Sequence, residues 1–144
     1  MAVQLVDDHQ AIAQAVAGIR RGVGDAVEHT GVRIEGNAVH VVKFVTRLAD
    51  DLDIESVVIP MFRRHTLCVS SQVGCRMGCR FCRTGKMGLL RSLTAAEITG
   101  QVFTARHRLG IDIRNVVFMG MGEPLDNWEE VARSLVTLKD ERGL

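Results

Sequence analysis

All four cysteines of this 144-residue chain lie in one stretch, Cys68-Val-Ser-Ser-Gln-Val-Gly-Cys75-Arg-Met-Gly-Cys79-Arg-Phe-Cys82. The last three follow the spacing C-x3-C-x2-C. Gathering thiols in one short segment adds nothing to core packing, so the pattern indicates a metal site, a disulfide or a nucleophile. Three thiolates on one loop suit a cubane iron–sulfur cluster whose fourth iron has no protein ligand and stays open to a small molecule.

The residues between the cysteines agree with a tight loop around such a cluster. Gly78 lets the backbone turn sharply, and Phe81 offers an apolar wall or a surface for an adenine ring. The alternative is a zinc site using all four cysteines. Zinc ligands usually come as two C-x2-4-C pairs far apart in sequence, whereas here six, three and two residues intervene. A structural disulfide requires an oxidising compartment, and nothing in the sequence indicates secretion.

Length and composition describe an ordinary globular chain. The 144 residues are enough for one domain with a core, and 47% of them are hydrophobic. No apolar run is long enough to span a membrane, and the N-terminus lacks the basic-then-apolar layout of a signal peptide. We therefore expect a cytoplasmic protein with reduced thiols.

The net charge of +1 hides a strong asymmetry. Residues 1–55 have a net charge of −4, residues 56–96 have +7 with no acidic side chain, and residues 97–144 have −2. A concentrated basic segment is typical of a polyanion partner such as RNA. The same residues also suit the balancing of a negative cluster and its ligand, and the sequence leaves both readings open. The basic side chains of this segment are Arg63, Arg64, Arg76, Arg80, Arg83, Lys86 and Arg91.

The first part of the chain predicts a short helix and a small antiparallel sheet. Apolar residues at helical spacing indicate a helix within residues 7–22. Strands are expected over residues 32–34 and 39–45, joined as a hairpin, and over residues 54–59, where Pro60 is expected to end the strand.

The second part alternates helices and strands. Thr94-Ala-Ala-Glu97 reads as a capping box opening a helix that Gly110 closes. Residues 116–119 are an apolar run typical of a buried parallel strand, and Asn127 is expected to cap a last helix. The inward faces of the two helices are predicted to be Ile98, Val102, Ala105 and Leu109, and Trp128, Val131, Leu135 and Leu138. This alternation predicts a parallel sheet with covering helices, whose site lies at the carboxyl ends of the strands.

A glycine-rich turn, Gly120-Met-Gly-Glu-Pro124, follows the predicted strand 116–119. Its uncovered carbonyl groups could accept hydrogen bonds from an ammonium group, and Glu123 would strengthen this by charge. Most such turns are simple connections. Next to a C-x3-C-x2-C loop at the same sheet edge, this one becomes a candidate part of the same site.

The cysteine loop resembles that of the radical SAM superfamily, whose signature is C-x3-C-x-aromatic-C. The resemblance implies a 4Fe-4S cluster bound by Cys75, Cys79 and Cys82. Its open iron would chelate S-adenosyl-L-methionine, which an electron from the cluster cleaves to a 5′-deoxyadenosyl radical. In that superfamily the turn after the second strand binds the methionyl amino group, which implies this role for Gly122 and Glu123, and Phe81 would border the cofactor.

Residues 39–144 look more narrowly like the RlmN and Cfr group, through residues 68–75, 95–98 and 117–125. These radical SAM enzymes methylate an adenine of 23S rRNA and, for RlmN, also of tRNA. The resemblance implies RNA as partner and an electron donor such as flavodoxin or ferredoxin. Glu55 matches the general base of the group, and Cys68 matches a cysteine that forms a transient disulfide at product release. From the residues alone, Glu55 reads as a solvent-exposed carboxylate and Cys68 as a small buried residue.

The chain departs from the group in two respects. Members carry a further cysteine near their C-terminus that is methylated during the reaction, and no cysteine follows Cys82 here. The family barrel also continues for several β/α units beyond the last predicted helix. We therefore expect an α/β fold, a partial radical SAM (β/α) barrel preceded by a short helix and small antiparallel strands. Residues 1–50 would form the N-terminal region and residues 51–144 an incomplete core, with an unpaired edge strand after Val116.

The leading interpretation is thus a radical SAM RNA adenine methyltransferase, present as its N-terminal part. A noncatalytic iron–sulfur or zinc RNA-binding module is a second interpretation. A third is a thiol redox-sensing module in which Cys68 pairs reversibly with one of the ligand cysteines.

Overall fold

The computed structural model describes residues 32–36, 41–61 and 64–140. The helix expected within residues 7–22 lies outside these ranges, as does the turn after Gly36. Among the described residues, no helix combines the length and the apolar character needed to cross a membrane.

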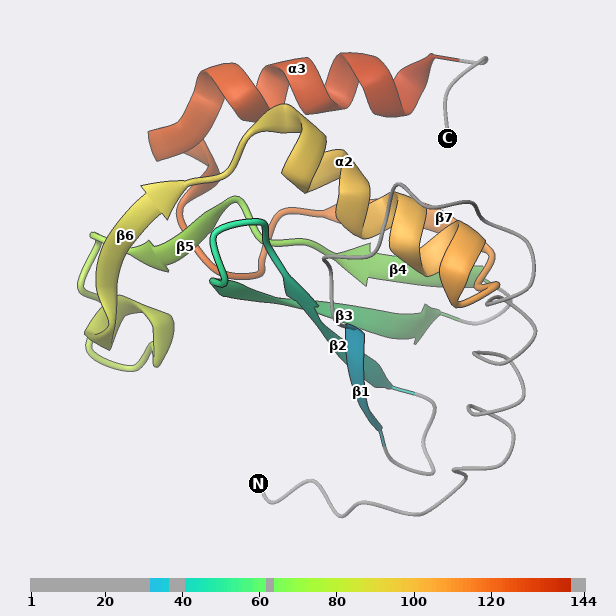
Figure 1. Cartoon of the computed structure of the whole chain (residues 1–144), viewed down its shortest axis with the longest axis horizontal. Helices are drawn as coiled ribbons and strands as arrows, with labels where there is room; N and C mark the ends of the chain where they lie inside the picture. Colours follow the sequence, from blue (N-terminus) through green and yellow to red (C-terminus); the bar gives the residue numbers. More distant parts are fainter. Residues whose placement is uncertain (1–31, 37–40, 62–63, 141–144) are drawn as a thin grey trace.

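One sheet of five strands organises the fold, in the order β1-β2-β3-β4-β7 (Figure 1). Strands β1 to β4 are antiparallel neighbours, and β7 joins β4 in parallel. The antiparallel strands predicted from sequence are confirmed, and a parallel strand is present in the same sheet. The prediction of a buried strand over residues 116–119 was wrong in its bounds and burial, since β7 ends at Val117 and only Ile113 of it is buried. The bounds are β1 Val32–Gly36, β2 Val42–Arg47, β3 Asp53–Met61, β4 Arg64–Cys68 and β7 Ile113–Val117.

Pro60 lies inside β3 and does not end it, so that prediction was wrong. The pairing of β2 with β3 stops at Val42 and Val58, while the pairing of β3 with β4 continues to Met61. Among the described residues, β3 beyond Val58 is therefore paired on one side only. A proline, which lacks the backbone N–H, is tolerated at such a position.

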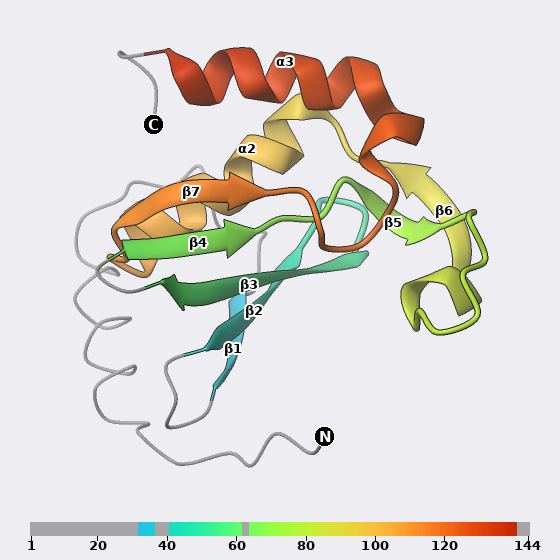
Figure 2. The same cartoon turned by 180° about the vertical axis from the view of Figure 1, so that it is seen from behind.

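A separate hairpin carries the cysteine loop. Strands β5 (Gln72–Cys75) and β6 (Gly88–Ser92) pair antiparallel and project beyond the end of the main sheet (Figures 1 and 2). The connection between the two strands contains the short 3-10 helix η1 (Thr84–Lys86).

The first helix agrees with its predicted signals. Helix α2 (Ala95–Phe103) continues into the π-helical segment η2 (Thr104–Arg108). Thr94 Oγ1 accepts a hydrogen bond from the Glu97 N–H while the Glu97 carboxylate accepts one from the Thr94 N–H, so the capping box is confirmed. Three predicted inward residues have no exposed surface and Leu109 packs against the core; the fully buried three are Ile98, Val102 and Ala105.

The last helix is rotated relative to the prediction. Helix α3 (Trp128–Lys139) follows the 3-10 turn η3 (Pro124–Asn127) and packs on α2 (Figure 1). Val131 is buried and Leu138 packs on the core as predicted, but Trp128 and Leu135 are 57% and 37% exposed. Fully buried Ser134 takes the inner position between Val131 and Leu138. Asn127 precedes the helix without capping it, because its side chain is used elsewhere.

Two apolar clusters build the core. The first fills the space between the sheet and α2 with η2: Phe44, Val58, Leu67, Val69, Val102, Ala105 and Ile113. The second joins the base of the β5–β6 hairpin to the two helices and to the turn after β7: Leu48, Ile54, Val73, Leu93, Ile98, Met121 and Val131. The second cluster therefore fixes the hairpin to the rest of the molecule.

Candidate functional site

The predicted site edge exists where β4 and β7 end side by side. Cys68 pairs with Val117, and the Val69 N–H donates to the Val117 carbonyl at 2.9 Å. Because the strands are parallel, both chains leave the sheet at the same edge. The segment after Cys68 and the glycine-rich turn after β7 therefore run next to each other. The sequence predicted this position for the cysteine loop itself, which follows β5 on the separate β5–β6 hairpin.

Backbone hydrogen bonds join these two segments. The Gly120 N–H donates to the Val69 carbonyl at 3.0 Å. The Met121 carbonyl accepts from the Ser71 and Gln72 N–H groups at 2.8 and 3.1 Å. The Met121 carbonyl is thus used within the protein, so an ammonium ligand would rely on other groups of the turn.

The two glycines of the turn are needed for this close approach. A Cβ atom on Gly120 would lie 2.7 Å from the Val69 carbonyl oxygen, closer than such contacts occur. Gly122 has φ +102°, and a Cβ atom there would lie 2.6 Å from the Cβ atom of Gln72. Side chains at either position would force the two segments apart, which is a stronger reason for glycine than backbone exposure.

The cysteine loop places its thiols at different depths. Cys75 ends β5 and is buried, Cys79 is exposed, and Cys82 is intermediate. The Cys82 N–H donates to the Cys79 carbonyl at 3.0 Å, which closes a tight turn. Gly78 has φ +62°, so the sharp backbone turn expected there is confirmed. Gly85 packs against Cys79, since a Cβ atom on it would lie 3.0 Å from the Cys79 backbone nitrogen.

The surroundings of the thiols set their ionisation. The backbone N–H of Gly85, helped by Thr84, lowers the pKa of the Cys82 thiol and favours the thiolate that binds metal. Burial raises the pKa of Cys68, and a backbone hydrogen bond from Met119 offsets this only in part. Cys82 therefore has the electronic character of a ligand, and Cys68 that of a protonated thiol.

Three thiolates on one loop fit an iron–sulfur cluster by chemical type. Within residues 32–36, 41–61 and 64–140, however, no three histidine, cysteine or carboxylate side chains are gathered closely enough to hold a metal ion. Cys75, Cys79 and Cys82 are thus close in sequence, but their side chains must still turn toward a common centre to bind a cluster. A zinc ion bound by the cysteines would require the same rearrangement.

The other candidate cofactor residues lie around this loop and turn. Phe81 is 93% exposed on the cysteine loop. Glu123 lies at the end of the glycine-rich turn, where its N–H donates to Gln72 Oε1 at 3.0 Å. One carboxylate oxygen of Glu123 accepts from the Leu125 N–H at 3.1 Å, so this side chain also caps η3.

Glu55 and Cys68 lie on one face of the sheet. Ile54, Ser56 and Val58 of β3 are buried toward α2, so the alternating residues Glu55 and Val57 face the other way. Cys68 pairs with Val57 and therefore shares that face. The Glu55 carboxylate is half exposed and forms an ion pair with Lys43 at 3.1 Å.

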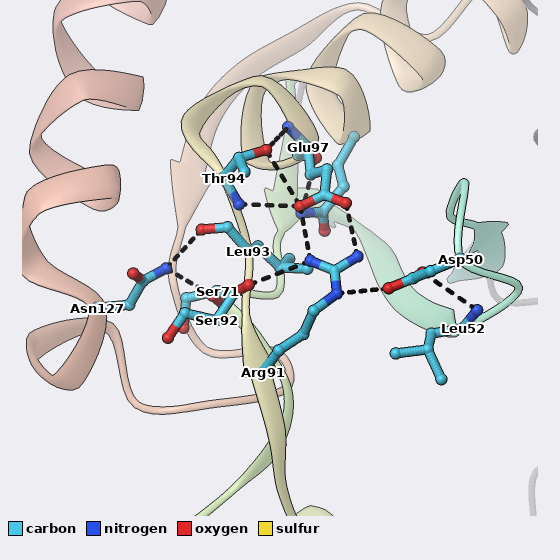
Figure 3. Close-up of polar contacts among 10 residues, drawn as sticks. Asp50, Leu52, Ser71, Arg91, Ser92, Leu93, Thr94, Glu97 and Asn127 are labelled. Carbon is cyan, nitrogen blue, oxygen red and sulfur yellow. Dashed lines mark hydrogen bonds and ion pairs between the residues drawn. The ribbon is translucent and has the colours of Figure 1, made fainter.

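The basic residues divide into two groups. Arg91 donates to both oxygens of Glu97 at 2.9 and 2.7 Å and to Asp50 at 2.6 Å, which ties β6 to α2 and to the turn before β3 (Figure 3). Arg76 forms an ion pair with Asp126 at 2.9 Å. These two arginines hold the hairpin in place. The basic residues of the segment that are exposed without such an ion pair to an acidic side chain among those described are Arg64, Arg80, Arg83 and Lys86.

Buried carboxamides hold the segment 69–72, and sequence reasoning missed them. Asn127 Nδ2 donates to the Ser71 and Leu93 carbonyls at 2.9 and 2.8 Å (Figure 3). Gln72 Nε2 donates to Asp126 at 2.8 Å, and Gln101 bonds the backbone of Ser70. One available signal was the position of Gln101, which falls on the apolar face of the predicted helix beside Val102.

Comparison with known proteins agrees with this geometry. Residues 69–143 match the profile of the Radical SAM superfamily, and the chain belongs to that superfamily. The expected partial radical SAM fold is thereby confirmed. With the family come its cofactors, a 4Fe–4S cluster and S-adenosylmethionine.

Particular relatives carry the resemblance further. The chain is 56% identical over 101 residues to a probable dual-specificity RNA methyltransferase RlmN of Protochlamydia amoebophila, covering 70% of this chain and 28% of that protein. It is 55% identical over 114 residues to the dual-specificity RNA methyltransferase RlmN of Nitratidesulfovibrio vulgaris, covering 72% of this chain and 31% of that protein. The chain thus spans less than a third of the length of these two relatives.

A solved structure shows the same fold. The radical SAM methyltransferase from Sphaerobacter thermophilus matches with a TM-score of 0.76 and 38% identity, covering 88% of this chain and 38% of that chain. The similarity to the RlmN group predicted from sequence is confirmed by the relatives and agrees with this structure.

Proposed function

We propose that this chain forms part of a radical SAM methyltransferase that acts on an adenine of 23S rRNA or tRNA. The observation that carries the proposal is the C-x3-C-x2-C loop, whose hairpin is joined to the turn Gly120–Pro124 by the hydrogen bond from the Gln72 N–H to the Met121 carbonyl. The RNA substrate is taken from the names of the relatives. Activity of this chain without the remaining parts of those relatives is not part of the proposal.

In this proposal Cys75, Cys79 and Cys82 hold the 4Fe–4S cluster. The bound cluster supplies the electron and the open coordination site on which cleavage of S-adenosylmethionine depends. Gly122 and Glu123 bind the methionyl amino group, the first by allowing close backbone approach and the second by charge. Phe81 covers an apolar part of the cofactor, for which its exposed ring is available.

Glu55 and Cys68 act on the substrate side. Glu55 removes a proton from the adenine carbon, for which a half-exposed carboxylate on an open sheet face is accessible. Cys68 lies on the same face, where burial raises the pKa of its thiol and so favours the protonated form.

Partners and boundaries follow from the same assignment. An electron donor such as flavodoxin or ferredoxin supplies the reducing equivalent, and the compartment is the cytoplasm. The core that binds the cofactor comprises residues 51–144, and residues 1–50 form the N-terminal region.

Anaerobic reconstitution with iron and sulfide, followed by EPR with and without S-adenosylmethionine, tests the proposal. A reduced cubane signal that changes on adding the cofactor is expected. Cys75→Ala, Cys79→Ala and Cys82→Ala should each lose the signal, while Cys68→Ala should keep it. A protein that takes up zinc and no iron would overturn the proposal and favour the zinc module.

A further inference from the structure

We propose that Ser70 is a positioning residue that fixes the strand bearing Glu55 relative to the cofactor turn. The inference rests on the proposed function, because it takes the roles of Glu55 and Gly122 from it. Ser70 has no exposed surface and lies two residues after Cys68, in the connection between β4 and β5.

A single hydroxyl group makes the link. Ser70 Oγ donates to the Glu55 carbonyl at 2.7 Å and accepts from the Met121 N–H at 2.9 Å. Met121 lies between Gly120 and Gly122. One buried oxygen thus joins β3 to the turn after β7, two parts of the chain that are not neighbours in the sheet.

Gln101 holds Ser70 itself from the helix side. Its Oε1 accepts from the Ser70 N–H at 2.8 Å and its Nε2 donates to the Ser70 carbonyl at 2.9 Å. The same Oε1 accepts from Ser56 Oγ at 2.8 Å. The backbone and the side chain of Ser70 are therefore bonded at the same time. A buried network in which these groups are all paired is rigid, since any shift leaves a polar group unsatisfied.

This rigid network bonds both the strand that carries Glu55 and the turn that carries Gly122. The Glu55 carboxylate projects from the sheet face opposite α2, while its backbone carbonyl is anchored by Ser70. The turn approaches so closely that a Cβ atom on Gly120 would lie 2.8 Å from Ser70 Oγ. Small misplacements of catalytic groups lower rates strongly, so a fixed separation between base and cofactor has functional value.

The test compares two buried serines of the same network. Ser70→Ala removes the bridge between Glu55 and Met121. Ser56→Ala, the matched control, also deletes one buried hydroxyl but leaves that bridge intact. Amide hydrogen exchange of the apo protein is measured first. The Met121 amide should exchange about tenfold faster in Ser70→Ala, the equivalent of about 1.4 kcal/mol, and within about twofold of wild type in Ser56→Ala.

The second readout is the change in the EPR spectrum of the reconstituted protein as S-adenosylmethionine is added. Half-saturation should need about tenfold more cofactor in Ser70→Ala than in Ser56→Ala, beyond any shared loss of thermal stability. A wild-type protein that ignores the cofactor would sink the proposed function. Equal behaviour of the two variants, with the wild type responding normally, would overturn only the positioning role.

A measurement on the wild-type protein covers the case in which Ser70→Ala does not fold. The Met121 amide should exchange about tenfold more slowly than the Gly122 amide, the comparison being restricted to Gly122 because the Gly120 and Glu123 amides donate to other groups. Exchange of the Met121 amide at the rate of the Gly122 amide would contradict the bridge without any substitution.

Discussion

At the scale of single residues, the four thiols differ most in their environment. Cys82 is accessible and its pKa is lowered by backbone N–H groups, whereas Cys68 is buried and its pKa is raised. In the apo, reduced protein at neutral pH, iodoacetamide should therefore modify Cys82 faster than Cys68 by on the order of tenfold or more. Mass spectrometry of the labelled peptides over time measures both rates. Equal rates would show that Cys68 is accessible as a thiolate.

Glycines supply a second prediction at this scale. Gly122→Ala should destabilise the protein by about 2 kcal/mol or more, because of its positive φ and the contact with Gln72. Gly100→Ala, in α2 with open space around the new methyl group, should stabilise by about 0.5–1 kcal/mol. Urea unfolding of the two variants gives both values. A neutral Gly122→Ala would mean that the turn can move away from the segment 69–72.

At the scale of elements, Arg91 joins three of them, and its pairing predicts a pH dependence. Burial alone would raise the pKa of Glu97, but hydrogen bonds from Arg91 and Thr94 outweigh it and lower the pKa; Arg91 also lowers the pKa of Asp50. Lowered carboxyl pKa values stabilise the fold at neutral pH. This contribution is lost as the pH falls below the ordinary values of 4.5 and 3.8 toward the folded ones.

Arg91→Met should therefore lower the free energy of unfolding by about 1–2 kcal/mol at pH 7, a value already reduced for the partial exposure of the arginine. The difference in stability from wild type should shrink below about pH 4. Thermal unfolding of the apo protein between pH 7 and pH 3 measures it. Arg133→Met, which breaks an exposed pair with Glu130 within α3, is the control and should cost little at any pH. If Arg91→Met lowered the stability by the same amount at every pH, Arg91 would stabilise the fold by packing and not through its ion pairs.

The elements also show what sequence reasoning reaches and where it stops. The capping box at Thr94 was predictable because both partners lie within four residues of each other. Asn127 has an equally local pattern, yet its amide bonds the Ser71 and Leu93 carbonyls, more than thirty residues away in sequence. Trp128 and Leu135 were misplaced for a related reason, since contact with α2 decides which face of α3 is inward.

For the candidate site, the cysteine spacing and the glycine-rich turn were predictable. The sequence also placed both at one sheet edge, but it is the segment 69–72 that meets the turn there, and the cysteine loop lies on the separate β5–β6 hairpin. The hydrogen bonds that hold these parts of the site together were not predictable. They depend on Ser70, Gln72 and Gln101, common polar residues whose partners lie up to 54 residues away. No periodicity or motif marks such a residue, and only the fold shows what it bonds.

At the scale of the whole molecule, substitutions of the exposed cations of the cysteine loop decide between two explanations of the basic segment. These cations either contact RNA or balance the charge of the cluster and its ligand. If they contact RNA, changing Arg80, Arg83 and Lys86 together to Gln should weaken binding of an RNA oligonucleotide. Each phosphate contact contributes roughly 0.7 to the slope of log affinity against log salt. Losing three contacts should therefore make the slope shallower by about 2.

The matched control changes Arg114, Arg133 and Lys139, three exposed cations outside the loop, and lowers the net charge equally. It should leave the slope nearly unchanged. Fluorescence anisotropy at several salt concentrations measures the slopes, and iron content verifies that both variants keep their cluster. Equal slopes in the two variants would favour the reading in which the loop cations balance the cluster and its ligand.

The sheet itself has an open side in the described part of the chain, where β7 pairs with β4 alone. The matched structure from Sphaerobacter thermophilus is longer, and this chain covers 38% of it. The pairing pattern agrees with the expectation of an edge strand in a partial barrel.

The anchoring of the segment 69–72 by Asn127 also has a consequence in time. Asn127 follows Cys82 by 45 residues, so the ribosome completes the cysteine loop well before it makes the side chain that holds the Ser71 and Leu93 carbonyls at the base of the hairpin. At roughly 5–20 residues per second, this interval is about 2–9 s. During those seconds the cysteine thiols are not yet held by the complete fold, and they are open to oxidation or to binding of a competing metal ion. Delivery of the cluster is therefore best timed after α3 has begun to emerge.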